Sequence, residues 1–77
     1  MDVTALELRL LGALVRARGR VLTREQLIRQ AWGENTHVGD RVVDTHILNL
    51  RKKIEPRAAE PQFLKSVRGL GYRLDLE

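Results

Sequence analysis

The stretch from Asp40 to Ile54 constrains the fold most, because apolar side chains recur there at helical spacing and its far end is basic. At about 100° per residue, one narrow arc of a helical wheel holds Val43, Ile47, Leu50 and Ile54. The opposite arc holds Arg41, Val42, Thr45, Asn49, Lys52 and Lys53. We therefore expect a helix with Asp40 as its N-cap, ended by Glu55 and Pro56, whose apolar arc packs inward.

A first helix is predicted upstream from the capping box "TALE", in which Thr4 and Glu7 bond each other's backbone N–H. It should run to about Arg18, before Gly19. One apolar stripe consists of Leu6, Leu10, Ala13, Leu14 and Ala17, and a second of Leu8, Leu11 and Val15. A helix with two apolar sides is normally buried on both. We therefore expect residues 1–77 to be a truncated fragment of a longer protein, prone to self-association or domain swapping.

A second helix is expected to follow the short extended piece 20–22. It opens at Thr23, where "TREQ" places Gln26 in the third position of another capping box, and it ends at Gly33. Residues 33–39 then form a loop that leads into the helix at 40–54.

The end of the chain resembles a β-hairpin. The stretches "FLKSV" and "YRLDL" are typical of strands, and "RGLG" between them supplies glycines for a tight turn. Alternation of Tyr72, Leu74 and Leu76 with polar residues predicts a half-buried hairpin, with Tyr72 as a packing residue. Arg68 would lie at its tip.

Together these segments predict an α+β, mostly helical fold. It is a single winged helix-turn-helix domain with three helices, a C-terminal β-hairpin wing and a short strand between the first two helices.

Composition narrows the function. The chain has 14 Lys and Arg against 10 Asp and Glu, and this excess favours a polyanionic partner. It has no cysteine and only two histidines, so we expect neither a metal site nor a cofactor. No catalytic constellation occurs at useful spacing, which argues against an enzyme. Glu7 and Arg9 interrupt an apolar stretch too short to cross a bilayer, so a soluble, intracellular domain is expected.

The outer arc of the 40–54 helix suits a DNA major groove, which admits one helix. An amide such as Asn49 can bond an adenine edge, Thr45 and Val42 can meet thymine methyl groups, and cations can neutralise phosphates. Arg68 could enter the adjacent minor groove. The residues predicted to contact DNA are Arg41, Val42, Thr45, His46, Asn49, Arg51, Lys52, Lys53, Arg68 and Arg73. An anion would repel phosphate, so Asp44 is expected to be structural, in a network that Arg51 could share.

Two other interpretations remain open. The basic helix could be a solvated amphipathic helix whose cations only confer solubility. Alternatively, the winged helix could be a protein–protein interaction module without DNA binding, although an acidic or apolar outer face would suit that role better.

Three stretches, "LTREQLIRQAWG", "RVVDTHILNLRKKIE" and "SVRGLGYRL", resemble the OmpR/PhoB-type winged-helix DNA-binding domain of two-component response regulators. The match extends from Val3 to Leu76. The resemblance implies a bacterial cytoplasmic domain that binds double-stranded promoter DNA as a head-to-tail dimer on direct repeats. It also implies a contact of loop 33–39 with RNA polymerase, and control by a receiver domain that this chain does not contain.

The chain departs from the family pattern in two places. Many members have arginine where this chain has Asn49, so adenine becomes a better candidate than guanine for that contact. Members also carry a four-stranded sheet before the first helix, which would cover the stripe of Leu8, Leu11 and Val15.

Overall fold

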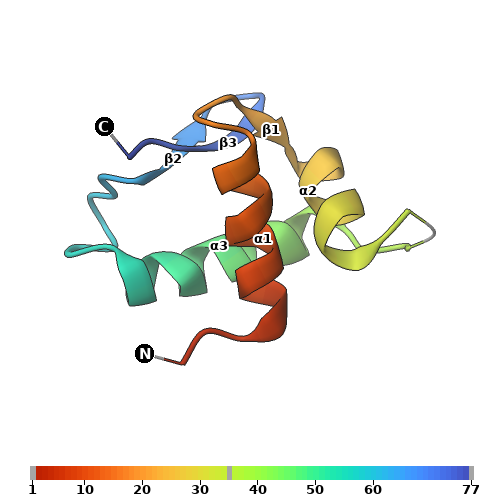
Figure 1. Ribbon diagram of the computed structural model, residues 1–77, viewed down its shortest axis with the longest axis horizontal. Helices are drawn as coiled ribbons and strands as arrows, with labels where there is room; N and C mark the ends of the chain where they lie inside the picture. Colours follow the sequence, from red (N-terminus) through yellow and green to blue (C-terminus); the bar gives the residue numbers. More distant parts are fainter. Residues whose placement is uncertain (1, 35, 77) are drawn as a thin grey trace.

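The computed structural model describes residues 2–34 and 36–76. Within these residues the elements are α1 (Ala5–Arg16), β1 (Leu22–Thr23), α2 (Arg24–Trp32), α3 (Asp40–Ile54), β2 (Leu64–Val67) and β3 (Gly71–Leu74). In Figure 1, α1 crosses α3, α2 lies beside them, and the strands gather near the C-terminal end of α1. This arrangement confirms the α+β winged helix-turn-helix prediction. No helix in the described ranges is long and apolar enough to cross a membrane.

The three helices enclose one core with the sheet. Its buried apolar residues are Leu10, Ala13, Leu14, Leu27, Ile28, Ala31, Val43, Ile47, Leu50, Leu64, Tyr72 and Leu74. The predicted inner face of α3 is therefore confirmed, with Ile54 partly buried at its end. Leu8 and Val15 on the second stripe of α1 are 61% and 50% exposed. Leu76 was expected to continue the buried alternation of the last strand, but β3 ends at Leu74 and Leu76 is exposed.

The strands form an antiparallel sheet in the order β1-β3-β2. The short strand expected at 20–22 forms at 22–23, where Leu22 pairs with Tyr72 and Thr23 with Gly71. Gly71 was expected to serve the hairpin turn, but its lack of a side chain matters more for this pairing. A Cβ at residue 71 would lie 2.0 Å from the Leu22 carbonyl oxygen. Glycine therefore allows β1 to join the wing.

Capping explains the positions of the helix starts. The boxes at Thr4 and Thr23 are both complete, as predicted. By contrast, Asp40 is the first residue of α3 rather than its N-cap, a position that Gly39 occupies without a side-chain bond. As an acid in the first turn, Asp40 still complements the helix dipole.

The C-terminal end of α1 comes earlier than expected. The helix ends at Arg16 instead of about Arg18, because Arg18 itself takes a positive φ of 53°. A residue with this backbone conformation cannot continue a right-handed helix.

Glu55 organises the chain after α3, a role that the sequence did not suggest. Its side chain is 7% exposed and accepts backbone N–H bonds from Gln62, Phe63 and Leu64 at 2.7–3.2 Å. Burial disfavours the charged form, but these donors hold the pKa of Glu55 below its ordinary value. This carboxylate therefore fixes the start of β2 against the end of α3.

Candidate nucleic-acid interface

The outward face of α3 carries a continuous exposed line. Arg41, Thr45, Leu48 and Lys52 are all exposed and recur at spacings of four, three and four residues. Such spacing places side chains one above another on a helix. Val42 lies beside this line and is 39% exposed. The line contains three of the predicted residues and Leu48, which the sequence prediction omitted although its helical position places it there.

Asn49 and His46 lie on the flank of α3 and are half-buried. The His46 ring packs against the Trp32 ring of α2, with centroids 5.5 Å apart and planes tilted by 58°. His46 therefore helps to join the two helices of the helix-turn-helix unit. At about 100° per residue, the helical position of Asn49 is closer to the exposed line than that of His46.

Arg51 faces the wing. Its Nε donates to the Leu64 carbonyl oxygen at 3.0 Å, and its Nη2 donates to the Ser66 hydroxyl at 2.9 Å. Its guanidinium carbon also lies 5.7 Å from the centroid of the Tyr72 ring. These contacts use several of its donors to tie α3 to β2 and β3.

Lys53 points to α1, away from its neighbour Lys52. Its Nζ lies 2.5 Å from Oε1 of Glu7, a residue that is only 2% exposed. The same Glu7 oxygen accepts the backbone N–H of Thr4 at 2.9 Å. The bond from Lys53, followed by that from Thr4, lowers the pKa of Glu7. Lys53 thus compensates a buried charge between α3 and the start of α1.

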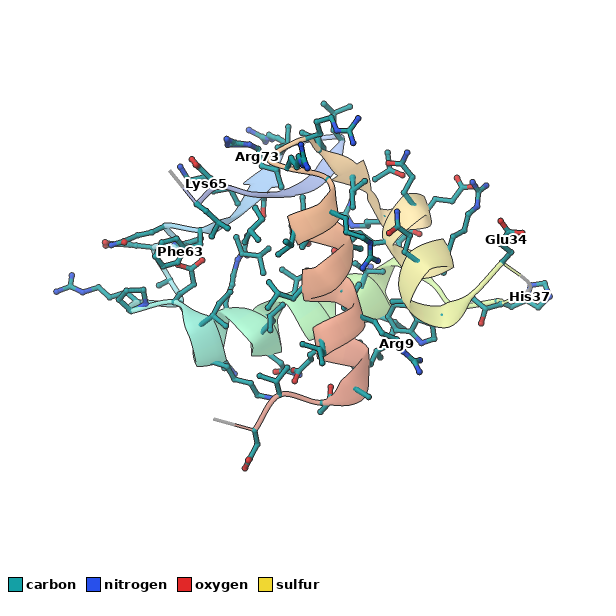
Figure 2. The ribbon with its side chains drawn as sticks, viewed as in Figure 1. Arg9, Glu34, His37, Phe63, Lys65 and Arg73 are labelled. Atoms are coloured by element: carbon teal, nitrogen blue, oxygen red, sulfur yellow. The ribbon has the colours of Figure 1, made fainter. Side chains whose placement is uncertain are left out.

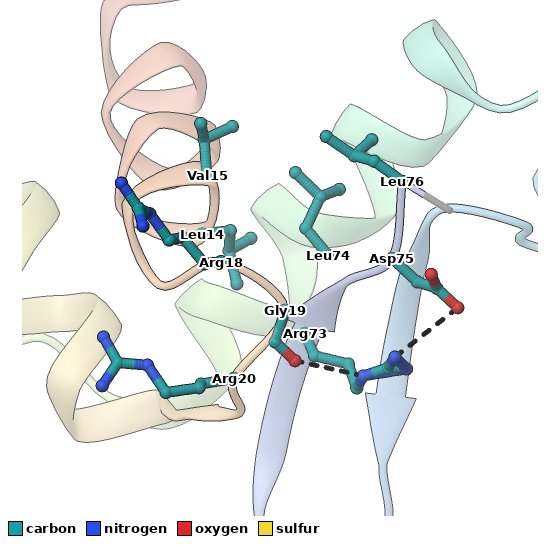
Figure 3. A pocket seen from close by; sticks show the side chains of 9 residues that line it. All are labelled: Leu14, Val15, Arg18, Gly19, Arg20, Arg73, Leu74, Asp75 and Leu76. Carbon is teal, nitrogen blue, oxygen red and sulfur yellow. Dashed lines mark hydrogen bonds and ion pairs between the residues drawn. The ribbon is translucent and has the colours of Figure 1, made fainter.

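Arg73 lies on the side of the wing that faces α1. Figure 3 shows its guanidinium bonded to the Gly19 carbonyl oxygen, at 3.3 Å, and paired with Asp75, at 3.5 Å. Asp75 also pairs with Lys65 at 3.0 Å. Gly19, Arg73 and Asp75 border a pocket that also includes Val15 and Leu76. The structure therefore places Arg73 apart from the exposed line of α3.

Asp44 connects α2, α3 and the wing. Its Oδ1 accepts from Arg24 Nε at 2.7 Å and from the Tyr72 hydroxyl at 2.6 Å. Partial burial opposes ionisation, yet the two donors hold the pKa of Asp44 below its ordinary value. Burial first, and then the bond to Asp44, raises the pKa of Tyr72. The predicted structural role of Asp44 and packing role of Tyr72 are confirmed, and Arg51 reaches the same cluster through the Tyr72 ring.

Arg68 occupies the turn between β2 and β3 and is exposed. The next residue, Gly69, has a φ of 78°, a conformation that glycine adopts without strain. Within residues 2–34 and 36–76, the Arg68 guanidinium has no hydrogen-bond or ion-pair partner. The wing tip thus presents a cation that is free to meet an anionic ligand.

Between α2 and α3, the side chains of Glu34 and His37 point away from the body of the domain, as Figure 2 shows. Glu25, Glu34 and Asp40 line a shallow depression there. Arg29 lines the same depression and pairs with Glu25, so this surface keeps a net negative charge, in contrast to the exposed line of α3.

The sequence matches a known family and several curated proteins. The family model described as "Transcriptional regulatory protein, C terminal" matches residues 1–74. BaeR, a transcriptional regulatory protein of Escherichia coli O6:H1, is 42% identical over 77 residues, which are all of this chain and 32% of BaeR. Sensory transduction protein RegX3 of Mycobacterium tuberculosis is 51% identical over 70 residues, or 90% of this chain and 30% of RegX3. The chain thus spans about a third of the length of these relatives.

Solved structures share the fold. The DNA-binding domain of response regulator AdeR, in complex with an intercistronic region, has a TM-score of 0.81 and 35% identity, covering 97% of this chain and 76% of that one. The DNA-binding domain of Klebsiella pneumoniae RstA, in complex with the RstA box, has a TM-score of 0.82 and 32% identity, covering 95% and 72%.

Proposed function

Because this chain belongs to the family of C-terminal domains of transcriptional regulatory proteins, we propose that it binds double-stranded promoter DNA sequence-specifically, as the effector domain of a phosphorelay response regulator. In this proposal α3 enters the major groove and the wing tip reaches the adjacent minor groove. The observation that carries it is the exposed line of α3, with a cation near each end, on the same small domain as the exposed Arg68. Two related domains with the same fold were solved in complexes with DNA segments.

The structure suggests different tasks for the candidate residues. Arg41, Lys52 and Arg68 have exposed cationic side chains suited to phosphates or to a narrow minor groove. Thr45, Val42 and Asn49 are the candidates for base edges.

The remaining candidates, His46, Arg51, Lys53 and Arg73, have partners inside the protein. We assign them to holding α3 and the wing in position. Any contact that they make with a phosphate would be additional to this task.

The proposal also includes partners other than a single DNA duplex. The domain would bind direct repeats as a head-to-tail dimer, under the control of a receiver domain elsewhere in a bacterial cytoplasmic regulator. The acidic surface beside loop 33–39, formed by Glu25, Glu34 and Asp40, would suit a basic patch of RNA polymerase.

The test is a binding titration on a duplex recovered by random-site selection. Asn49→Ala should weaken the selected site by about 1–3 kcal/mol and relax one base position. Lys52→Ala should weaken all duplexes alike and reduce the salt slope by about one. Arg29→Ala is the matched control, because Arg29 is an exposed cation on α2 paired with Glu25. Affinities of the Asn49 and Lys52 variants equal to that of the Arg29 variant would contradict the docking.

The rival function is a winged helix that binds only proteins. DNA affinity that falls steeply with added salt supports the proposed function, because cations on the protein then replace counterions on the phosphates. An affinity that does not change with salt would favour the rival.

A further inference from the structure

We propose that Leu48, together with the methyl group of Thr45, recognises thymine methyl groups in the major groove. This inference rests on the proposed function and extends it from DNA binding to the kind of base that the centre of α3 reads. It concerns the part of the exposed line that carries no charge.

Leu48 is available for such a contact because the core does not need it. The side chains of Val43, Ile47 and Leu50 fill the inner side of α3 and are fully buried. Leu48 is instead 49% exposed. A single exposed leucine is ordinary on a protein surface. Leu48 differs from such a leucine because it lies in the middle of the exposed line of α3.

Thr45 lies one turn before Leu48 and adds to the same apolar spot. Its hydroxyl donates to the Arg41 carbonyl oxygen at 3.1 Å, within the helix. Since this bond uses the only donor of the side chain, Thr45 has an acceptor oxygen and a methyl group left for a ligand. The centre of the line is therefore poor in hydrogen-bond donors.

Charge identifies a duplex as the occupant of this spot. Arg41 precedes Thr45 by one turn and Lys52 follows Leu48 by one turn, and both are exposed. An apolar centre with cations before and after it matches a groove whose rims are phosphates. In the major groove the thymine C5-methyl is the apolar group that marks a base.

The neighbouring Asn49 agrees with this assignment. An adenine edge suits its amide, and each adenine pairs with a thymine whose methyl lies in the same groove. Leu48 and Asn49 can thus read neighbouring A·T pairs, one through the thymine and the other through the adenine.

The experiment removes one methyl group at a time from the DNA. A site is first selected from random duplexes with the wild-type chain. Each thymine of this site is then replaced by deoxyuridine, which lacks only the C5-methyl, and affinity is measured by fluorescence anisotropy. We expect one or two positions at which wild-type binding weakens about fourfold, the effect of one buried methyl.

Protein variants then assign these positions. Leu48→Ala should bind the thymine and deoxyuridine forms of one such site equally. Thr45→Ser removes a methyl but keeps the hydroxyl, and it should abolish discrimination at an adjacent position. Leu8→Ala is the matched control, because Leu8 is an exposed leucine on α1. The Leu8→Ala variant should distinguish the thymine and deoxyuridine duplexes as the wild type does.

The outcomes separate the two proposals. If no selected duplex is bound above a random one, the proposed function fails. If a site is bound specifically but every deoxyuridine duplex binds as well as its parent, only the thymine inference fails. If Leu48→Ala still distinguishes thymine from deoxyuridine at every position as the wild type does, the proposed role of Leu48 is also wrong.

Discussion

The Tyr72 hydroxyl donates a 2.6 Å hydrogen bond to Asp44, which joins the wing to α3. The same carboxylate oxygen accepts from Arg24 at 2.7 Å, so α2 is held at this point as well. The guanidinium carbons of Arg24 and Arg51 lie 5.5 and 5.7 Å from the centroid of the Tyr72 ring. Cations at this distance from an aromatic ring are attracted to it. The cluster thus links α2, α3 and the wing.

Tyr72→Phe should lower the free energy of unfolding by about 1–2 kcal/mol, because it removes a hydrogen bond to a charged group and preserves the ring. Urea denaturation without DNA measures this change. In an Asp44→Asn background the same substitution should cost clearly less, since the charged acceptor is already gone. Equal costs in both backgrounds would show that the bond does not couple the two residues.

Arg51 and Lys52 are neighbours in sequence with different expected effects. Arg51→Ala should lower the free energy of unfolding by about 1–2 kcal/mol, because it removes the bonds to Leu64 and Ser66. Lys52→Ala should change it by less than about 0.5 kcal/mol, as is usual for an exposed site. Denaturation of both variants without DNA provides the comparison. If the Arg51 variant is as stable as the wild type but binds DNA poorly, Arg51 contacts DNA, and its assignment to positioning is wrong.

Glu55 should contribute to acid unfolding. Its pKa is lowered in the folded protein from an ordinary value of 4.5. Its contribution to stability is therefore complete above that value and is lost as the pH falls through the lower, folded-state pKa. Glu55→Gln should be about 2–3 kcal/mol less stable near neutral pH, because an amide cannot replace both acceptor oxygens.

A series of urea titrations between about pH 7 and about pH 3 tests the sign of this effect. The difference between wild type and Glu55→Gln should shrink as the pH falls below 4.5. Asp44 and Glu7 also have lowered pKa values, so the variant keeps part of the pH dependence. A constant difference across the series would contradict the charged role of Glu55.

Glycine substitutions should differ sharply by position. Gly71→Ala places a Cβ 2.0 Å from the Leu22 carbonyl oxygen and should cost about 3 kcal/mol or more, with loss of the β1–β3 pairing. Gly39→Ala is the control, because no atom of the described residues other than its chain neighbours lies within 4 Å of a Cβ there, and φ is −76°. It should change the stability by less than about 1 kcal/mol, because the lower unfolded-state entropy of alanine is opposed by its poorer fit at the N-cap of α3. Thermal melts and amide exchange of Tyr72 distinguish these results.

Local signals predicted much of the fold. Both capping boxes and the inner arc of α3 depend on residues within a few positions of each other, so period and spacing were sufficient. β1 was harder to place, because its two residues pair with a strand almost 50 positions later.

The candidate site was predicted less completely, because side-chain partners came from distant segments. The sequence prediction placed Lys53 on the outer arc together with Lys52, yet Lys53 pairs with Glu7, 46 positions away. Because Lys53 was assigned to the outer face, the predicted centre of that face lay away from Leu48. Leu48 was therefore omitted from the prediction. From the sequence, Glu55 was expected only to end the helix. The groups that donate hydrogen bonds to it are backbone N–H groups, which cannot be identified from the side-chain types in a sequence.

The cluster around Tyr72 restrains the wing relative to α3 through contacts that need no DNA. In the proposed complex, a duplex bound through two adjacent grooves would therefore have to adopt the twist and groove width that match the protein. Operators with identical contacted bases would then be ranked by how readily the uncontacted steps between them deform.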